Sequence, residues 1–199
     1  AAIAAAATAS NMAYAMGGRY IGTAPGETLT SNQVWRFNPL AAAGTRWSAL
    51  PALPRARCYI APAVVDDTLL YAMGGDTLIY ATLLQARPNC TRINLNNTPA
   101  GWTAIADTPD SIGETRAFAF NVSPQLGFNR QIVLAGQGKW PAESAKCFIY
   151  TVSTNSWQQF ARLDSARRNH AGAFIAGTSG ANGVPGMWHG MASSWSSSP

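Results

Sequence analysis

The sequence is short of charge and of the residues that most enzymes use. Of its 199 residues only 12% are Asp, Glu, Lys or Arg, and there are two histidines, His170 and His189. A globular protein ordinarily carries about twice that share of charge. No GxSxG elbow, HExxH motif or Walker loop occurs, and Gly138-Lys139 lacks the Ser or Thr that would complete a phosphate loop. The sequence therefore predicts no enzyme, no cofactor and no metal site.

Cysteine and long apolar runs are also scarce. Cys58, Cys90 and Cys147 lie far apart and form no CxxC pair, which excludes a structural zinc site of the usual spacing. They leave open one disulfide with an odd thiol, or three buried thiols. No apolar stretch approaches the roughly twenty residues that span a bilayer, so no membrane span is predicted.

The net charge of +5 is spread along the chain rather than gathered. It comes mostly from 12 arginines, whose longest run is Arg167-Arg168. Nucleic-acid binding normally needs a basic stripe or patch. We therefore expect no nucleic-acid partner.

What the sequence does contain is an internal repeat. Tyr-Ala-Met-Gly-Gly occurs at residues 14–18 and again at residues 71–75. The same shift places Ile3 on Ile60 and Ala4 on Ala61. The Ala-rich opening is therefore predicted to be the first strand of a repeat, although a helix is the alternative because Ala is a strong helix former.

Tryptophan, glycine and arginine mark three such units. Trp47, Trp102 and Trp157 are evenly spaced, and each follows an apolar stretch and a turn rich in Asn, Pro, Gly or Ser. The other markers are three glycine clusters and one arginine beyond each Trp segment: Gly17-Gly18, Gly74-Gly75, Gly136-Gln137-Gly138, Arg57, Arg116 and Arg168. Four short antiparallel strands per unit are typical of a propeller blade.

This set of motifs resembles the kelch repeat. The sequence has "YAMGG" twice and "VLAGQG" once as strand ends, "RFNP" and "FIYTV" as third strands, and the three Trp in fourth strands. Met and Ala replace the more usual Val and Ile before Gly-Gly, and Gln137 interrupts the third glycine pair. The resemblance implies an all-β, kelch-like β-propeller with four-stranded antiparallel blades of about 55 residues.

The resemblance covers residues 1–176, which divide into blades at about 1–57, 58–116 and 117–168, with a fourth starting at 169. Residues 177–199 are predicted to be an irregular Gly/Ser-rich tail. Because propellers have about four to eight blades, these repeats predict an incomplete ring. The ring would belong to a longer propeller or close with another chain.

A kelch-like propeller implies a non-catalytic binding or scaffolding module that contacts a protein or a glycan through its loops. The alternative is a structural subunit of a larger extracellular assembly or fibre. A weaker alternative is a copper radical oxidase of the galactose oxidase type, which kelch-like propellers host. That chemistry needs two His, two Tyr and a Cys, and the spacing here matches no such set. His170 is expected to be a structural histidine that opens a first strand.

The predicted contact residues follow the glycine clusters, in the longest loops. Those loops are residues 21–33, 76–89, 124–130 and 139–146. Five residues follow the glycine clusters at equivalent places and would therefore lie near one another on one face of the ring: Arg19, Tyr20, Asp76, Lys139 and Trp140. The alternative is that they are ordinary exposed loop residues.

Three sequons fit N-linked glycosylation. Asn96 is the best candidate because it precedes Trp102 in a predicted exposed turn, and the others are Asn89 and Asn121. Together with the low charge, they favour a secreted or cell-surface protein. A cytoplasmic kelch protein is the alternative.

Overall fold

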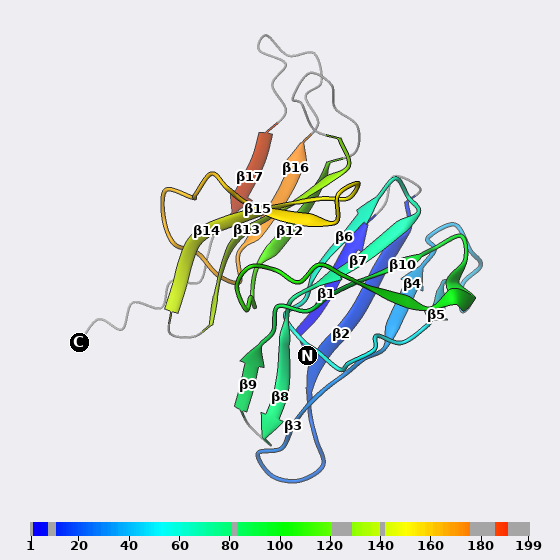
Figure 1. Cartoon of the computed structure of the whole chain (residues 1–199). Helices are drawn as coiled ribbons and strands as arrows, with labels where there is room; N and C mark the ends of the chain where they lie inside the picture. The colour runs from blue at the N-terminus through cyan, green and yellow to red at the C-terminus, as the bar shows by residue number, and fades with distance from the viewer. Residues whose placement is uncertain are drawn as a thin grey trace.

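The computed structural model describes residues 2–7, 11–80, 83–120, 129–139, 142–175 and 186–190 (Figure 1). Within these ranges the chain is all-β, and the one helical segment is a short 3-10 turn, Thr98–Ala100. Every strand pairing there is antiparallel. No helix in this part of the chain is long and apolar enough to cross a membrane.

Three four-stranded sheets follow one another along the chain, and in each the spatial order of the strands is their order in sequence. Sheet 1 contains β1 (Ala2–Ala7), β2 (Ala13–Ile21), β4 (Val34–Phe37) and β5 (Trp47–Leu50), with β3 (Thr28–Thr30) pairing β2. Sheet 2 contains β6 (Ala61–Val65), β7 (Leu69–Met73), β10 (Cys90–Asn94) and β11 (Trp102–Ile105). Sheet 3 contains β12 (Arg116–Phe120), β13 (Gln131–Lys139), β14 (Ala142–Thr151) and β15 (Ser156–Phe160).

Two further strand pairs complete the described fold. One is β8 (Asp76–Tyr80) with β9 (Leu83–Ala86), and the other is β16 (Ala171–Ile175) with β17 (Gly186–Gly190). The prediction of an all-β chain with four-stranded antiparallel sheets is confirmed. The Ala-rich opening is a strand, β1, so the helix alternative was wrong.

The register explains the repeated pentapeptide. The strand positions just before the glycines form one equivalent row in all three sheets: Ala4–Met16–Val34, Ala61–Met73–Cys90 and Arg116–Ala135–Cys147. Tyr-Ala-Met-Gly-Gly is thus the same part of the second strand in two sheets: β7 ends just before its glycines, whereas β2 continues through them to Ile21. The glycine that follows each row has positive φ, +60° at Gly17, +56° at Gly74 and +59° at Gly136.

The next sheet's incoming segment lies against these glycines. Gly18 donates its N–H to the Arg57 carbonyl at 2.9 Å, and Gly75 donates to the Ile112 carbonyl at 2.9 Å. A Cβ on Gly74 would lie 2.7 Å from the Ile112 carbonyl oxygen. Glycine is therefore required here both by the backbone angle and by the close approach of another segment.

The arginine marker was wrong. Arg57, Ile112 and Arg167 occupy the equivalent place, because their carbonyl oxygens lie against Gly17, Gly74 and Gly136 respectively. Arg116 and Arg168 lie at other positions of the repeat. The structural requirement is a backbone carbonyl, which any residue supplies, so the side chain is not constrained to be arginine.

The sheets stack face to face. We call the face of a sheet that is directed toward the preceding sheet its rear face, and the opposite one its front face. Two buried clusters join front to rear: Tyr14, Met16 and Val34 with Leu70, Ala72 and Ile93, and then Ala63, Tyr71 and Cys90 with Ile132, Leu134 and Tyr150. The front face of sheet 3 carries a third cluster that includes Phe118, Val133 and Ile149.

A tryptophan joins each sheet to the one before it. The Trp102 indole N–H donates to the Pro51 carbonyl at 2.8 Å, and the Trp157 indole N–H donates to the Ala106 carbonyl at 2.9 Å. Both acceptors follow the last strand of the preceding sheet. Trp47 holds the equivalent position in sheet 1, where it packs on Phe37 and is 54% exposed.

Candidate functional site

Beyond the glycines, each sheet extends into a hairpin that we call its arm. Arm 1 pairs the end of β2 with β3, arm 2 is β8–β9, and arm 3 is the outer part of β13–β14, where Lys139 pairs with Ala142. Strand β3 contacts β8, and both lie at the lower edge of Figure 1 with β9. The predicted loops 76–89 and 139–146 are therefore largely paired strands. The loop 21–33 is mostly irregular and, beyond the end of β2, contains only the short strand β3, and most of the loop 124–130 lies outside the described residues.

Arg19 and Tyr20 lie on arm 1, as exposed residues. Arg19 Nη2 donates to the Thr28 hydroxyl at 3.3 Å across the arm, and Tyr20 is 47% exposed. Lys139 ends β13, but its side chain lies outside the described part, and so does Trp140 as a whole. Of the five predicted contact residues, the structure thus places Arg19 and Tyr20 at exposed positions, and their role in binding stays a prediction.

Asp76 corrects the prediction of an exposed loop. It is 1% exposed, and its backbone pairs with Cys58 through hydrogen bonds of 2.7 and 2.9 Å at the base of arm 2. Its carboxylate lies against Gly113, where a Cβ would come within 2.2 Å of Oδ1. This position is buried because the incoming segment of the next sheet crosses the base of the arm.

Large apolar residues on the arms were missed by the sequence reasoning. Ile21 on arm 1 is 84% exposed and Tyr80 on arm 2 is 73% exposed, and Ile79 and Leu83 are also exposed. The signal was present in "DTLIY", a β-rich run interpreted as loop because it follows a glycine pair. Together with Tyr20, these residues make five exposed large apolar residues on two arms that contact each other through β3 and β8.

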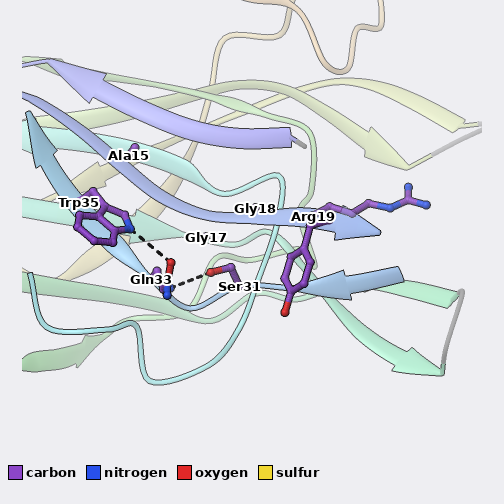
Figure 2. Close-up of a pocket in the computed structure, with 8 residues that line it drawn as sticks. Ala15, Gly17, Gly18, Arg19, Ser31, Gln33 and Trp35 are labelled. Atoms are coloured by element: carbon purple, nitrogen blue, oxygen red, sulfur yellow. Dashed lines mark hydrogen bonds between the residues drawn. The ribbon is translucent and has the colours of Figure 1, made fainter. Parts of the chain in front are cut away.

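A cavity of about 380 Å³ opens beside arm 1 (Figure 2). Trp35 donates its indole N–H to the Gln33 side-chain oxygen at 3.4 Å, and Gln33 N–H donates to the Ser31 hydroxyl at 3.1 Å. The lining comprises Ala15, Gly17, Gly18, Arg19, Tyr20, Ser31, Gln33 and Trp35.

This cavity lies on the rear face of sheet 1, which no other sheet of the described residues covers. Ala15 is equivalent to Ala72 and Leu134, which are 0% and 2% exposed because the preceding sheet covers them. Trp35, in contrast, is 38% exposed. The geometry is therefore that of a sheet-packing face rather than of an enclosed ligand pocket.

A second cavity of about 380 Å³ lies between arms 2 and 3 and is polar. Asp110 joins its walls by accepting hydrogen bonds from Lys146 Nζ at 2.8 Å and from Gln137 Nε2 at 3.2 Å. Close by, the buried Arg168 pairs with Glu114, and its Nε donates to Glu143 at 3.2 Å. These contacts tie sheet 3 to its neighbouring segments.

The described cysteines and histidines do not form a metal or catalytic cluster. Cys58, Cys90 and Cys147 are all free and buried, so of the open alternatives the structure has three buried thiols. Burial raises the pKa of Cys58 to about 12 and that of Cys90 to about 11. His170 is buried just before β16, and the His189 side chain lies outside the description. Among the residues whose placement is given, no three His, Cys, Asp or Glu cluster as metal ligands would.

The sequons differ in accessibility. Asn96 is exposed in the turn after β10, where its N–H donates to the Asn94 side chain at 2.9 Å. Asn89 is exposed as well, but its Nδ2 donates to Asp107 at 3.1 Å, and the two residues that follow it are buried. Asn121 lies outside the described residues. Asn96 is therefore the better presented acceptor of the two.

Comparison with known proteins finds structures of similar fold but does not assign the chain to a family. No family model matches the sequence, and no curated protein matches it. Solved structures do match: one described as "Structure of YjhT" has a TM-score of 0.61 at 15% sequence identity, over 83% of this chain and 53% of that one. The likeness is one of fold. This chain spans about half the length of that neighbour.

Proposed function

We propose that the chain is part of a kelch-like β-propeller that serves as a non-catalytic binding module and contacts a protein partner through its arms. The observation that supports this best is the number of large apolar residues that arms 1 and 2 expose: Tyr20, Ile21, Ile79, Tyr80 and Leu83. Large apolar side chains left exposed on neighbouring segments are candidates for burial in an interface. A glycan is the alternative ligand.

The propeller part of the proposal rests on the repeated junction between sheets. Each sheet meets the next front to rear, with a Trp on the rear face bonded to a carbonyl beyond the last strand of the preceding sheet. Blades that stack in this way bury faces that no single blade could bury alone. The sheets that the structure describes would form part of such a ring, and further blades would complete it.

The arms suit binding because they are hydrogen-bonded hairpins rather than open loops. Ladder bonds such as Tyr20 to Leu29 in arm 1 and Thr77 to Gln85 in arm 2 hold their strands. A partner therefore meets side chains that are already held in place, and less conformational entropy is lost on binding. Tyrosine is among the residues that dominate binding energy at interfaces.

A peptide-display selection against the whole chain tests this proposal. We expect selected peptides to lose about thirtyfold in affinity with Tyr20→Ala or Tyr80→Ala, which corresponds to about 2 kcal/mol for an interface tyrosine. Leu40→Ala is the control, because Leu40 is 83% exposed between β4 and β5 and away from the arms. Selected peptides that are insensitive to both arm variants, or equally sensitive to the control, would contradict the proposal.

The rear face of sheet 1, which no other described sheet covers, favours a second candidate, a structural subunit of a larger assembly. Trp35 and Trp47 expose there the positions that are covered in sheets 2 and 3. Concentration-dependent sedimentation of the purified chain, abolished by Trp47→Lys and retained in Leu40→Lys, would support this role. A monomer at all concentrations would argue against it.

We also propose a secreted or cell-surface location, on the basis of the exposed Asn96 sequon and the low charge. The intact mass of native material, before and after removal of N-linked glycans, tests this. A mass drop that disappears in Asn96→Gln would support the proposal, and an unchanged mass would favour the cytoplasmic alternative.

A further inference from the structure

Arg57 is buried between sheets 1 and 2 and is only partly hydrogen-bonded. It is 2% exposed. Its Nη1 donates to the carbonyls of Gly74 at 2.9 Å and Asn89 at 2.7 Å, and its Nη2 donates to the Thr91 hydroxyl at 3.3 Å. A guanidinium has five N–H groups. Among the described residues, Nε is buried without a partner. Nη2 makes one hydrogen bond there, so one of its two hydrogens is left over.

The positive charge of Arg57 has no adjacent counter-ion. Among the described residues, no Asp or Glu oxygen lies within 4.0 Å of its guanidinium. The acid that shares its surroundings is Asp107, whose carboxylate accepts a hydrogen bond from Asn89 Nδ2 at 3.1 Å. Burial lowers the pKa of Arg57, since desolvation disfavours the charged form.

The fold itself does not require an arginine at this place. At the next junction the equivalent residue is Ile112, which is 1% exposed and whose carbonyl accepts the same glycine hydrogen bond. An apolar side chain thus joins two sheets there without any buried charge. The third equivalent residue, Arg167, is an arginine but is only half-buried. A fully buried guanidinium is costly and is found at this place only at the first junction, which points to a chemical role.

Arg57 lines a cavity of about 240 Å³ that is rich in donors. Arg55 adds a second guanidinium from the exposed side, and the Thr91 hydroxyl, which accepts from Arg57, keeps its own hydrogen to donate. The remaining lining is Pro54, Asn89, Cys90, Ala104 and Asp107. The two arginines outnumber the one acid, which leaves the cavity with a net charge of one positive unit.

We propose that this cavity binds the carboxylate group of a small ligand, held by the unused Nε and Nη2 hydrogens of Arg57 together with the Thr91 hydroxyl and Arg55. The planar edge of a guanidinium presents parallel N–H groups that match the two oxygens of a carboxylate. A single negative charge neutralises the cavity, whereas a doubly charged phosphate would exceed its charge. The site is separate from the arms and does not depend on the function proposed for them.

NMR of arginine Nε–H groups in the full chain tests the proposal, with sodium acetate as the probe at constant ionic strength. The Arg57 resonance is assigned by its loss in Arg57→Lys. We expect it to shift saturably with acetate and to respond more weakly to inorganic phosphate. No shift with acetate, or a tighter response to phosphate, would overturn the carboxylate assignment.

Two further variants keep the test independent of Arg57, whose replacement can disturb folding. Arg55→Gln, at an exposed position, should weaken acetate binding about threefold. Asp107→Asn should strengthen it about fivefold by removing a like charge from the lining. Arg46→Gln, an exposed arginine in the turn before β5, is the control and should change nothing. If Asp107→Asn instead destabilises the chain and leaves acetate affinity unchanged, Asp107 is the counter-ion of Arg57 and the proposal is wrong.

Discussion

Replacement of Trp102 by Phe should destabilise the chain, whereas the same change at Trp47 should not. Trp102→Phe removes the indole N–H that donates to the Pro51 carbonyl at 2.8 Å and leaves that half-buried oxygen without its donor. The cost of such a loss is about 1–2 kcal/mol, and the smaller ring adds about 1 kcal/mol of lost apolar contact. For a chain of this size, a total of about 2 kcal/mol lowers the melting temperature by roughly 4–8 °C.

Trp47 offers a matched control within the same molecule. It occupies the equivalent strand position but is 54% exposed, and its indole N–H has no acceptor among the described residues. Trp47→Phe should therefore change stability by less than about 0.5 kcal/mol. Far-UV circular dichroism during thermal and urea unfolding measures both variants without relying on tryptophan fluorescence. Equal losses at the two positions, or no loss at Trp102, would refute the inference that the preceding sheet determines the contribution of this tryptophan.

Two other perturbations test the neighbourhood of Cys58. Gly75→Ala should lower the free energy of unfolding in urea by more than about 2 kcal/mol, because φ is +92° and the new Cβ would lie 2.7 Å from the Cys58 carbonyl. Gly101→Ala is the control: φ is +75° but the space around it is open, so it should lower that free energy by only about 1 kcal/mol. Burial raises the pKa of Cys58 from 9.0 to about 12, so the unfolded chain loses this proton first and the free energy of unfolding should fall by about 1 kcal/mol per thiol as pH rises from 8 to 10. Cys58→Ala should flatten that fall, and an unchanged pH slope would mean that the folded thiol ionises normally.

The periodic features of the fold could be predicted from the sequence, because they record contacts that recur. The tryptophans are evenly spaced because they occupy the same rear-face position in three successive sheets. Glycine recurs at Gly17 and Gly74 because the backbone there has a positive φ that other residues rarely adopt. Even the Ala-rich opening could be identified as a strand, because the repeat aligned it with β6. Its composition alone favoured a helix.

Features that depend on neighbours could not be predicted in this way. Asp76 follows a glycine pair like Arg19, yet it is buried because a segment of the next sheet crosses it. The arms were interpreted as loops, because a hairpin that extends beyond a glycine turn has no periodic signal of its own. Arg57 was counted as a repeat marker, although only its carbonyl is repeated. Its unused N–H groups became visible only once the surrounding atoms were placed.

The tryptophan junction gives the stack of sheets a direction. Sheet 2 carries both a donor on its rear face and an acceptor beyond its last strand, so it joins sheets 1 and 3 head to tail through the same pair of groups. Such a heterologous joint does not specify how many units follow one another. A gene encoding these units can therefore gain or lose a whole repeat by duplication or deletion without inventing a new interface, provided that the break falls between one acceptor and the next donor.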